Sequence, residues 1–243
     1  YALCFGLGLS TDNKGDSQFG LRATYDQTWI NPLGAEFGAE LTLGNAPSLH
    51  AEFYQPLSLD RAAFVAPYLD YGLSPDSVFL DDQRVARYNV IRGRFGVDLG
   101  TTLRGTELRI GPYYGQTNVN LDTGSPELPV GRITDTGFRA RLLYDTLDSA
   151  AVPRSGTRVL LEVLNPLEAL GADVQYTRAF LSATTAYSFG PNTLALKLKG
   201  GSSFGEQMPY YDQFPLGGFL NLSGYANEQF RGNDMAFAGL AYY

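Results

Sequence analysis

Apolar and polar side chains alternate along most of this chain, and this period of two limits the fold more than any other feature. Successive side chains of a strand point to opposite faces, so alternation over four to eight residues indicates a strand with one apolar face. Apolar residues fill the odd positions of 1–9, 19–25, 35–43 and 49–53, and the even positions of 138–144 and 194–198. We therefore predict an all-β chain.

Strand length separates the two all-β architectures that alternate in this way, a soluble β-sandwich and a transmembrane barrel. The predicted strands 85–100 and 174–189 exceed the usual strand of about 5–6 residues. A tilted strand that crosses a bilayer needs about 9–11 residues. Length thus favours the barrel. Within 85–100 the apolar residues change parity between Val90 and Ile91, which we interpret as a β-bulge.

The connections between about twelve predicted strands alternate in length. Barrels of the bacterial outer membrane have tight periplasmic turns and longer outer loops. The short set is 31–34, 58–61, 101–105 and 190–192, and the longer set is 11–18, 74–80, 121–132, 166–171 and 206–229. Two connections, 44–47 and 146–156, break the rule. We predict a transmembrane antiparallel up-and-down β-barrel over residues 1–243, located in the bacterial outer membrane and in contact with its lipids.

The charged residues of the alternating segments are predicted to face the barrel lumen. An arginine or lysine on the lipid side of the midplane costs about 2–4 kcal/mol, a cost that the lumen face avoids. These predicted lumen residues are Arg22, Glu36, Glu40, Glu52, Arg92, Arg94, Asp98, Arg139, Arg141, Lys197 and Lys199.

Composition argues against nucleic acid and metal ligands. The net charge is -7, and the 18 basic residues are scattered rather than grouped into a basic patch. A single cysteine and a single histidine give little for a metal site. We therefore expect no cofactor, no metal and no nucleic acid partner.

Two short motifs resemble catalytic signatures, and we interpret both as structural. Residues 201–205 match G-x-S-x-G, but this motif needs a following helix and a nearby base, whereas His50 is distant in sequence. Asp122 and Asp135 each begin an Asp-Thr-Gly triplet, which turn formation explains. No catalytic residue is predicted in this chain.

The longest connection, 206–229, is expected to fold into the lumen. Its central part is apolar and punctuated by glycine, and a barrel of this size encloses space that wall side chains do not fill. The residues of this predicted lumen-inserting loop are Leu216, Gly217, Gly218, Leu222, Ser223, Gly224 and Tyr225.

Leu216-Gly217-Gly218 followed by Leu222-Ser223-Gly224-Tyr225 resembles the inward-folding loop of the bacterial surface-antigen superfamily. This superfamily includes barrel-assembly proteins and two-partner-secretion transporters. Residues 144–148 with 153–157 resemble its other recurrent segment. The resemblance implies about sixteen strands, so about four would lie outside this chain. The superfamily loop commonly has an arginine in place of Ser223, and we expect Arg231 to substitute only if it points inward.

Residues 28–34, 53–57 and 219–225 look characteristic of one branch, the barrel of bacterial patatin-like phospholipase autotransporters. That likeness implies a polypeptide with an N-terminal lipase, a POTRA domain and this barrel. The barrel would anchor the attached lipase and help it reach the cell surface. Lipid hydrolysis would then use a Ser-Asp dyad outside this chain, which is not itself an enzyme.

Two alternatives remain open. A barrel-assembly or polypeptide-secretion transporter would have several POTRA modules and no lipase, whereas a passive porin-like channel would conduct with its long loop intact. Every version implies the outer-membrane assembly machinery as a partner. Homodimer formation through a lateral face is also open, because the sequence identifies no interface.

Overall fold

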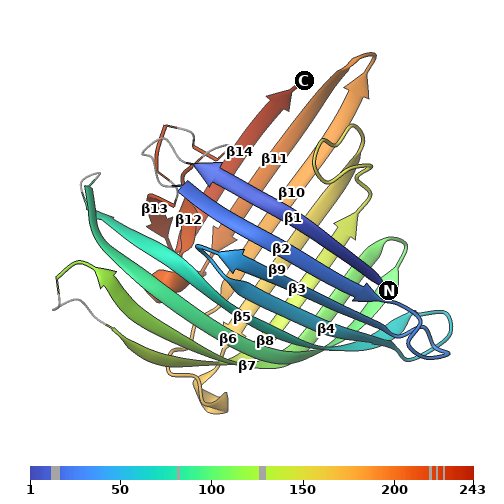
Figure 1. Ribbon diagram of the computed structural model, residues 1–243, viewed down its shortest axis with the longest axis horizontal. Coiled ribbons are helices and arrows are strands. Elements are labelled where there is room, and N and C mark those ends of the chain that lie inside the picture. The colour runs from blue at the N-terminus through green and yellow to red at the C-terminus, as the bar shows by residue number, and fades with distance from the viewer. Residues whose placement is uncertain (12–16, 81–82, 126–129, 219–220, 223, 227) are drawn as a thin grey trace.

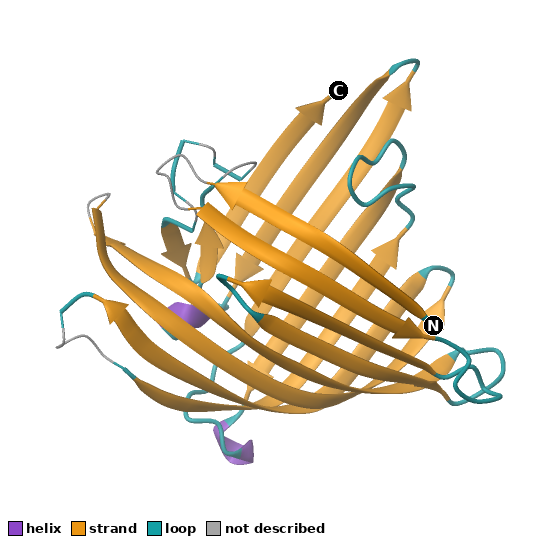
Figure 2. Cartoon of the chain, viewed as in Figure 1, coloured by secondary structure: helices purple, strands orange, loops and turns teal. Residues whose placement is uncertain are grey.

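The computed structural model describes residues 1–11, 17–80, 83–125, 130–218, 221–222, 224–226 and 228–243. Twelve antiparallel strands form one sheet, which curls so that β1 to β4 pass in front of β9 to β14 (Figures 1 and 2). The strands are β1 (Ala2–Thr11), β2 (Ser17–Gln27), β3 (Glu36–Gly44), β4 (Ser48–Pro56), β5 (Ala63–Leu80), β6 (Gln83–Leu103), β7 (Thr106–Thr123), β8 (Gly131–Asp145), β9 (Gly156–Pro166), β10 (Arg178–Phe189), β11 (Asn192–Ser202) and β14 (Asp234–Tyr242). In the described part of the chain, no helix is long and apolar enough to cross a membrane.

Each strand pairs with its sequence neighbours, and β14 pairs with β11 after a long insertion. β1 and β14 are the two edges of the sheet. The prediction of an all-β antiparallel up-and-down fold with about twelve strands is confirmed. A total of sixteen strands stays a prediction.

The two faces of the sheet differ as the alternation predicts. Large apolar side chains stand exposed on the outer face, such as Phe5 at 70% and Leu240 at 68%. On the other face, Asp98 of β6 reaches Arg139 of β8 across the intervening strand β7. Side chains two strands apart meet in this way on the concave side of a curved sheet, so this is the inner face.

The connections lie at two ends of the curled sheet. The short turns, together with Tyr1 and Tyr243, lie at one end, toward the right and top of Figure 1, which we call the turn end. The connections around 45–47 and 167–177 and the long insertion lie at the opposite end, which we call the loop end.

Strands β5, β6 and β7 run 18, 21 and 18 residues and correct two predictions. The predicted loop 74–80 is strand, because β5 stays paired with β6 as far as Leu80. No bulge lies between Val90 and Ile91; the register shifts lie at Val78/Phe79 and Arg87/Tyr88. Val90 is apolar on the inner face because it belongs to a cluster that packs against Tyr211 of the long insertion.

The predicted strand 174–189 is also shorter than expected. β10 begins at Arg178, and residues 174–177 belong to the preceding connection, which contains the short helix η1 (Glu168–Leu170). Tyr176 leaves the strand pattern because its hydroxyl donates a hydrogen bond to Asp212 of the insertion.

Candidate functional site

A long insertion between β11 and β14 crosses the inner face of the sheet, and we call residues 206–232 the inserted segment. It contains the short helix η2 (Tyr210–Asp212) and a small hairpin of β12 (Phe214–Leu216) and β13 (Phe230–Gly232). Tyr210 donates a hydrogen bond to the Ser77 carbonyl of β5, and Lys199 of β11 donates one to Asn221 at 2.9 Å. The segment therefore spans the space between distant parts of the curled sheet.

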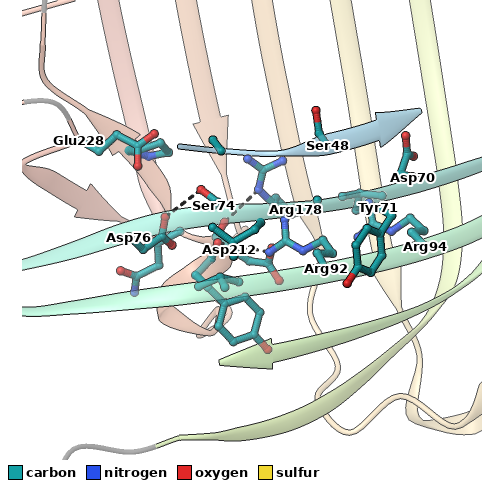
Figure 3. A pocket seen from close by; sticks show the side chains of 18 of the residues that line it. Ser48, Asp70, Tyr71, Ser74, Asp76, Arg92, Arg94, Arg178, Asp212 and Glu228 are labelled. Carbon is teal, nitrogen blue, oxygen red and sulfur yellow. Dashed lines mark hydrogen bonds and ion pairs between the residues drawn. The ribbon is translucent and has the colours of Figure 1, made fainter. Parts of the chain in front are cut away.

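Asp212 is the first anchor of the inserted segment. Its carboxylate accepts a hydrogen bond from Arg92 of β6 at 2.8 Å, and Arg178 of β10 donates to its backbone carbonyl at 3.0 Å (Figure 3). The Tyr176 hydroxyl also donates to this carboxylate. Asp212 is only 8% exposed. Because bonds to a charged group contribute about 1.5–3 kcal/mol each, this cluster fixes η2 against the wall.

Arg231 is the second anchor. Its guanidinium lies 3.1 Å from Asp76 of β5 and 2.7 Å from Glu228, and its side chain is 5% exposed. Arg231 also lies over the Tyr210 ring at 5.0 Å. Arg231 thus points inward. This orientation is the condition under which it could substitute for the arginine that the superfamily loop commonly has in place of Ser223. Burial raises the pKa of Glu228 above its ordinary value, and the neighbouring Arg231 opposes that rise.

Phe214 forms an apolar contact between the inserted segment and the wall. Its side chain is 2% exposed and its ring stacks on Phe180 at 6.2 Å. A Cβ added to Gly201 would lie 2.6 Å from the Phe214 ring. The first glycine of the G-x-S-x-G match therefore admits a packed aromatic ring.

A network of largely buried charges joins β4, β6, β7 and β8 on the inner face. Arg139 pairs with Asp98, and their side chains are 10% and 1% exposed. The Arg139 guanidinium also lies 3.8 Å from the centre of the Tyr68 ring, which covers Gly96. The remaining pairs of this network are Arg94 with Asp135 and Arg109 with Glu52 and Glu107.

The predicted lumen charges on other strands have looser surroundings. Arg22 lies 3.3 Å from Glu40, with side chains 60% and 38% exposed. Glu36 pairs with Arg61 from the following hairpin turn at 3.0 Å. In the part of the chain that the structure describes, Arg141 and Lys197 form no ion pair, and Lys199 contacts the inserted segment.

The predicted loop residues lie in the hairpin and the bend that follows it. Gly217 and Gly218 adopt positive φ of 137° and 90°, and Gly218 forms an isolated bridge with Leu222. Tyr225 packs edge-on against Phe230 at 4.8 Å. Leu216 ends β12, and Gly224 is exposed. Ser223 lies outside the described residues, as do positions 219 and 220.

The tempting catalytic motifs have structural roles. Ser203 is fully buried and donates to the Glu206 carbonyl at 2.6 Å, while His50 pairs with Asp70 on the neighbouring strand at 2.6 Å. Asp135 accepts bonds from Arg94 and Tyr113. Among the residues described, no group of three or more histidine, cysteine or acidic side chains is placed to hold a metal.

Sequence reasoning missed Asp212, Tyr176 and Asp76, which hold the inserted segment. Asp212 lies in a connection, where no periodicity marks which side chains turn inward. Tyr176 belonged to the predicted strand 174–189, which begins only at Arg178 in the structure. Pro75 and Asp76 are typical turn residues and therefore predict a loop. In the structure both continue β5 beyond its pairing with β4, which ends at Gly72.

Comparison with known proteins identifies the family. Residues 31–242 match the model of the Omp85 superfamily domain. The fold is similar to "The crystal structure of BamA from Haemophilus ducreyi lacking POTRA domains 1-3", with a TM-score of 0.72 and 15% sequence identity over 93% of this chain and 46% of that chain. No curated protein matches. The chain spans under half of that solved structure, and it belongs to the Omp85 superfamily of bacterial outer-membrane β-barrel proteins.

Proposed function

We propose that this barrel handles polypeptides in the outer membrane, as an assembly or secretion protein, and that the inserted segment controls its bore. The observation that carries this proposal is the fixing of the segment by two separate anchors, Asp212 and Arg231, on the inner wall of an Omp85-type barrel. A surface loop without a lumen role has no need of buried ion pairs, because burying charges costs several kcal/mol per ion unless they are well paired.

The distribution of the anchors supports a bore that is only partly occupied. The anchoring contacts described above join the segment to β5, β6, β10 and β11 and to the connection before β10. The inner face of β2 to β4 instead borders a separate cavity of about 660 Å³ that includes Glu36, Glu40 and Glu52. One wall of the bore therefore holds the segment while the facing wall leaves space beside it.

The test uses the full-length protein in its bacterium. We expect Asp212→Asn combined with Arg231→Gln to reduce assembly or secretion of client proteins, measured by their amounts in the outer membrane and medium. Arg22→Gln is the matched control, since its ion pair is exposed. Unchanged client levels in the double variant would contradict the proposal. A persistent open conductance of the wild type in planar bilayers would instead favour a passive channel.

A second candidate is the anchoring and surface delivery of an attached patatin-like lipase. It is supported by the resemblance of segments 28–34 and 53–57, which meet in the structure where the Asn31 amide donates to Gln55 at 2.7 Å. This contact also has a purely structural use, because it ties the turn after β2 to β4. In this version the N-terminal lipase and one POTRA domain precede the barrel, with the catalytic dyad upstream of Tyr1.

Sequencing of the gene upstream of Tyr1 separates the two candidates. The lipase version requires a G-x-S-x-G elbow and a later Asp-Gly-Gly or Asp-Gly-Ala before a single POTRA module. It also requires hydrolysis of fluorescent phospholipid by the full-length protein. Several POTRA modules and no hydrolysis would exclude the lipase version and agree with the first proposal.

A further inference from the structure

A cavity of about 640 Å³ lies between the inserted segment and the inner face of the sheet (Figure 3). Strands β4, β5, β6, β9 and β10 and residues of η2 and β12 line it. Most of its charged side chains form ion pairs with one another or with residues just outside it. These pairs are His50–Asp70, Arg92–Asp212, Arg94–Asp135, Arg231–Asp76 and Arg231–Glu228.

Two charges of opposite sign remain after this pairing. Arg178 of β10 and Glu162 of β9 both line the cavity, and in the described part of the chain neither forms an ion pair. Arg178 pairs in register with Leu164, two residues from Glu162, so the two charges are diagonal neighbours on adjacent strands. Diagonal neighbours are about 7–8 Å apart, with their Cβ atoms somewhat closer, so one small ligand can reach both charged groups.

Arg178 is held in position to present its guanidinium. Its Nε donates to the Asp212 carbonyl, and its guanidinium lies 4.5 Å from the centre of the Phe214 ring and 5.9 Å from that of Phe180. Its two terminal nitrogens point away from Asp212 into the cavity (Figure 3). A planar guanidinium with two free donors matches the oxygens of a phosphate group.

Glu162 supplies the opposite charge. Its carboxylate has no hydrogen-bond partner among the described residues, and it shares the cavity wall with Arg178. A simple anion on Arg178 would be repelled by this carboxylate, whereas a ligand with an ammonium group beside its anionic group would satisfy both side chains. The wall therefore selects for a zwitterion.

We propose that this cavity binds a small zwitterion of the phosphoethanolamine type, with its phosphate on Arg178 and its ammonium group on Glu162. The ligand is either the free compound or the headgroup of a lipid, since both present the same two charges. The site is independent of the polypeptide-handling proposal, because it needs only the cavity and its two unpaired charges.

The test is isothermal titration calorimetry of the full-length protein in a non-ionic detergent. Phosphoethanolamine is expected to bind at least about tenfold more tightly than phosphate or ethanolamine alone, because a charge-assisted contact contributes more than about 1.4 kcal/mol. A lysophosphatidylethanolamine titration distinguishes the two sources: tighter binding than that of the free compound assigns the site to a lipid headgroup. Equal binding of phosphate and phosphoethanolamine would overturn the proposal, as would the absence of binding.

Variants of the two charges provide the second arm. Glu162→Gln is expected to weaken phosphoethanolamine binding at least about tenfold. Among the described residues, no hydrogen bond or ion pair of an anchor involves Glu162, so this variant leaves the anchors intact. Arg178→Gln is expected to have the same effect, and the double exchange Arg178→Glu with Glu162→Arg to restore part of the binding.

Arg158→Gln is the matched control on β9, because Arg158 pairs with Asp145 outside the cavity. It is expected to bind phosphoethanolamine as the wild type does. Retention of full affinity in Glu162→Gln would overturn the proposal. The heat-dependent mobility shift of a folded barrel in gel electrophoresis shows that each variant has folded.

Discussion

The inner faces of β2–β3 and of β6–β8 carry the same kinds of charged residues in different physical states. On β2 and β3, Arg22 and Glu40 remain 60% and 38% exposed. On β6 and β8, Asp98 and Arg139 are 1% and 10% exposed, under an aromatic ring. The first pair is exposed to water like a surface ion pair. In the second pair, each buried charge needs the other to offset the cost of its burial. The burial of an ion pair, rather than its charge alone, therefore decides how much it contributes to the stability of the barrel.

The sharpest test of this difference is removal of one arginine from each region. Arg139→Ala leaves the Asp98 carboxylate buried without its partner, and breaking a buried pair costs about 3–5 kcal/mol. Arg22→Ala is expected to lower the free energy of unfolding by less than about 1 kcal/mol, because exposed pairs contribute little. Urea titrations in lipid vesicles measure both values. Equal losses would remove the distinction between the two regions.

The next largest effect concerns the inserted segment. Asp212→Asn removes the charge from the bonds to Arg92 and Tyr176, which are worth about 1.5–3 kcal/mol each. We expect the segment to leave the wall more often and to be cut faster by added protease. The matched control is Asp26→Asn, at an inner position of β2 that lies in the other cavity. Equal cleavage rates in the two variants would show that Asp212 is not an anchor.

Glycine substitutions compare packing in the β6–β8 region with packing on the edge strand β1. A Cβ at Gly96 would lie 2.5 Å from the Tyr68 side chain, whereas a Cβ at Gly6 of β1 meets nothing within 4 Å. Overpacking of this kind costs about 1–3 kcal/mol. Gly96→Ala is therefore expected to lower the urea midpoint and Gly6→Ala to leave it unchanged. A similar drop in both variants would show that the close approach of Tyr68 to Gly96 is not the cause.

The smallest effect is expected at the turn end, outside both regions. Backbone amides of Arg154 and Ser155 donate to Asp148 and lower the pKa of its carboxyl below the ordinary 3.8. A lowered pKa means that the stabilisation is complete above the ordinary value and is lost as pH falls through the lower folded value. We expect Asp148→Asn to speed hydrogen exchange at these two amides a few-fold at neutral pH. Exchange that is unchanged would show that the carboxylate does not order the turn.

The sequence predicted the wall of the barrel well because the wall is periodic. Alternation along β1 to β4 predicts those strands correctly, since each side chain there faces either lipid or the lumen and meets no further requirement. The error at Val90 has the same origin. Alternation shows which residues are apolar, but an inner residue is apolar as well where another segment packs on it.

The contacts of the inserted segment could not be predicted in the same way. Asp212 meets Arg92 across 120 positions of the chain, and no local pattern specifies such a contact. The sequence argument for an inward loop was the space that wall side chains leave unfilled, and it specified no contact of the segment. The sequence left the orientation of Arg231 open. Only the folded structure shows that this side chain pairs with Asp76 of β5.

The length of β5 to β7 has a mechanical consequence. Their distal parts extend past the last paired residue of β4, and there they carry both Asp76 and the Tyr88 cluster that contacts the segment. Asp76 and Tyr88 are register partners on β5 and β6, so a bend of the sheet at this point shifts both contacts at once. An antibody fragment that binds and bends this part of the sheet would therefore displace the contacts that hold the inserted segment inside the barrel.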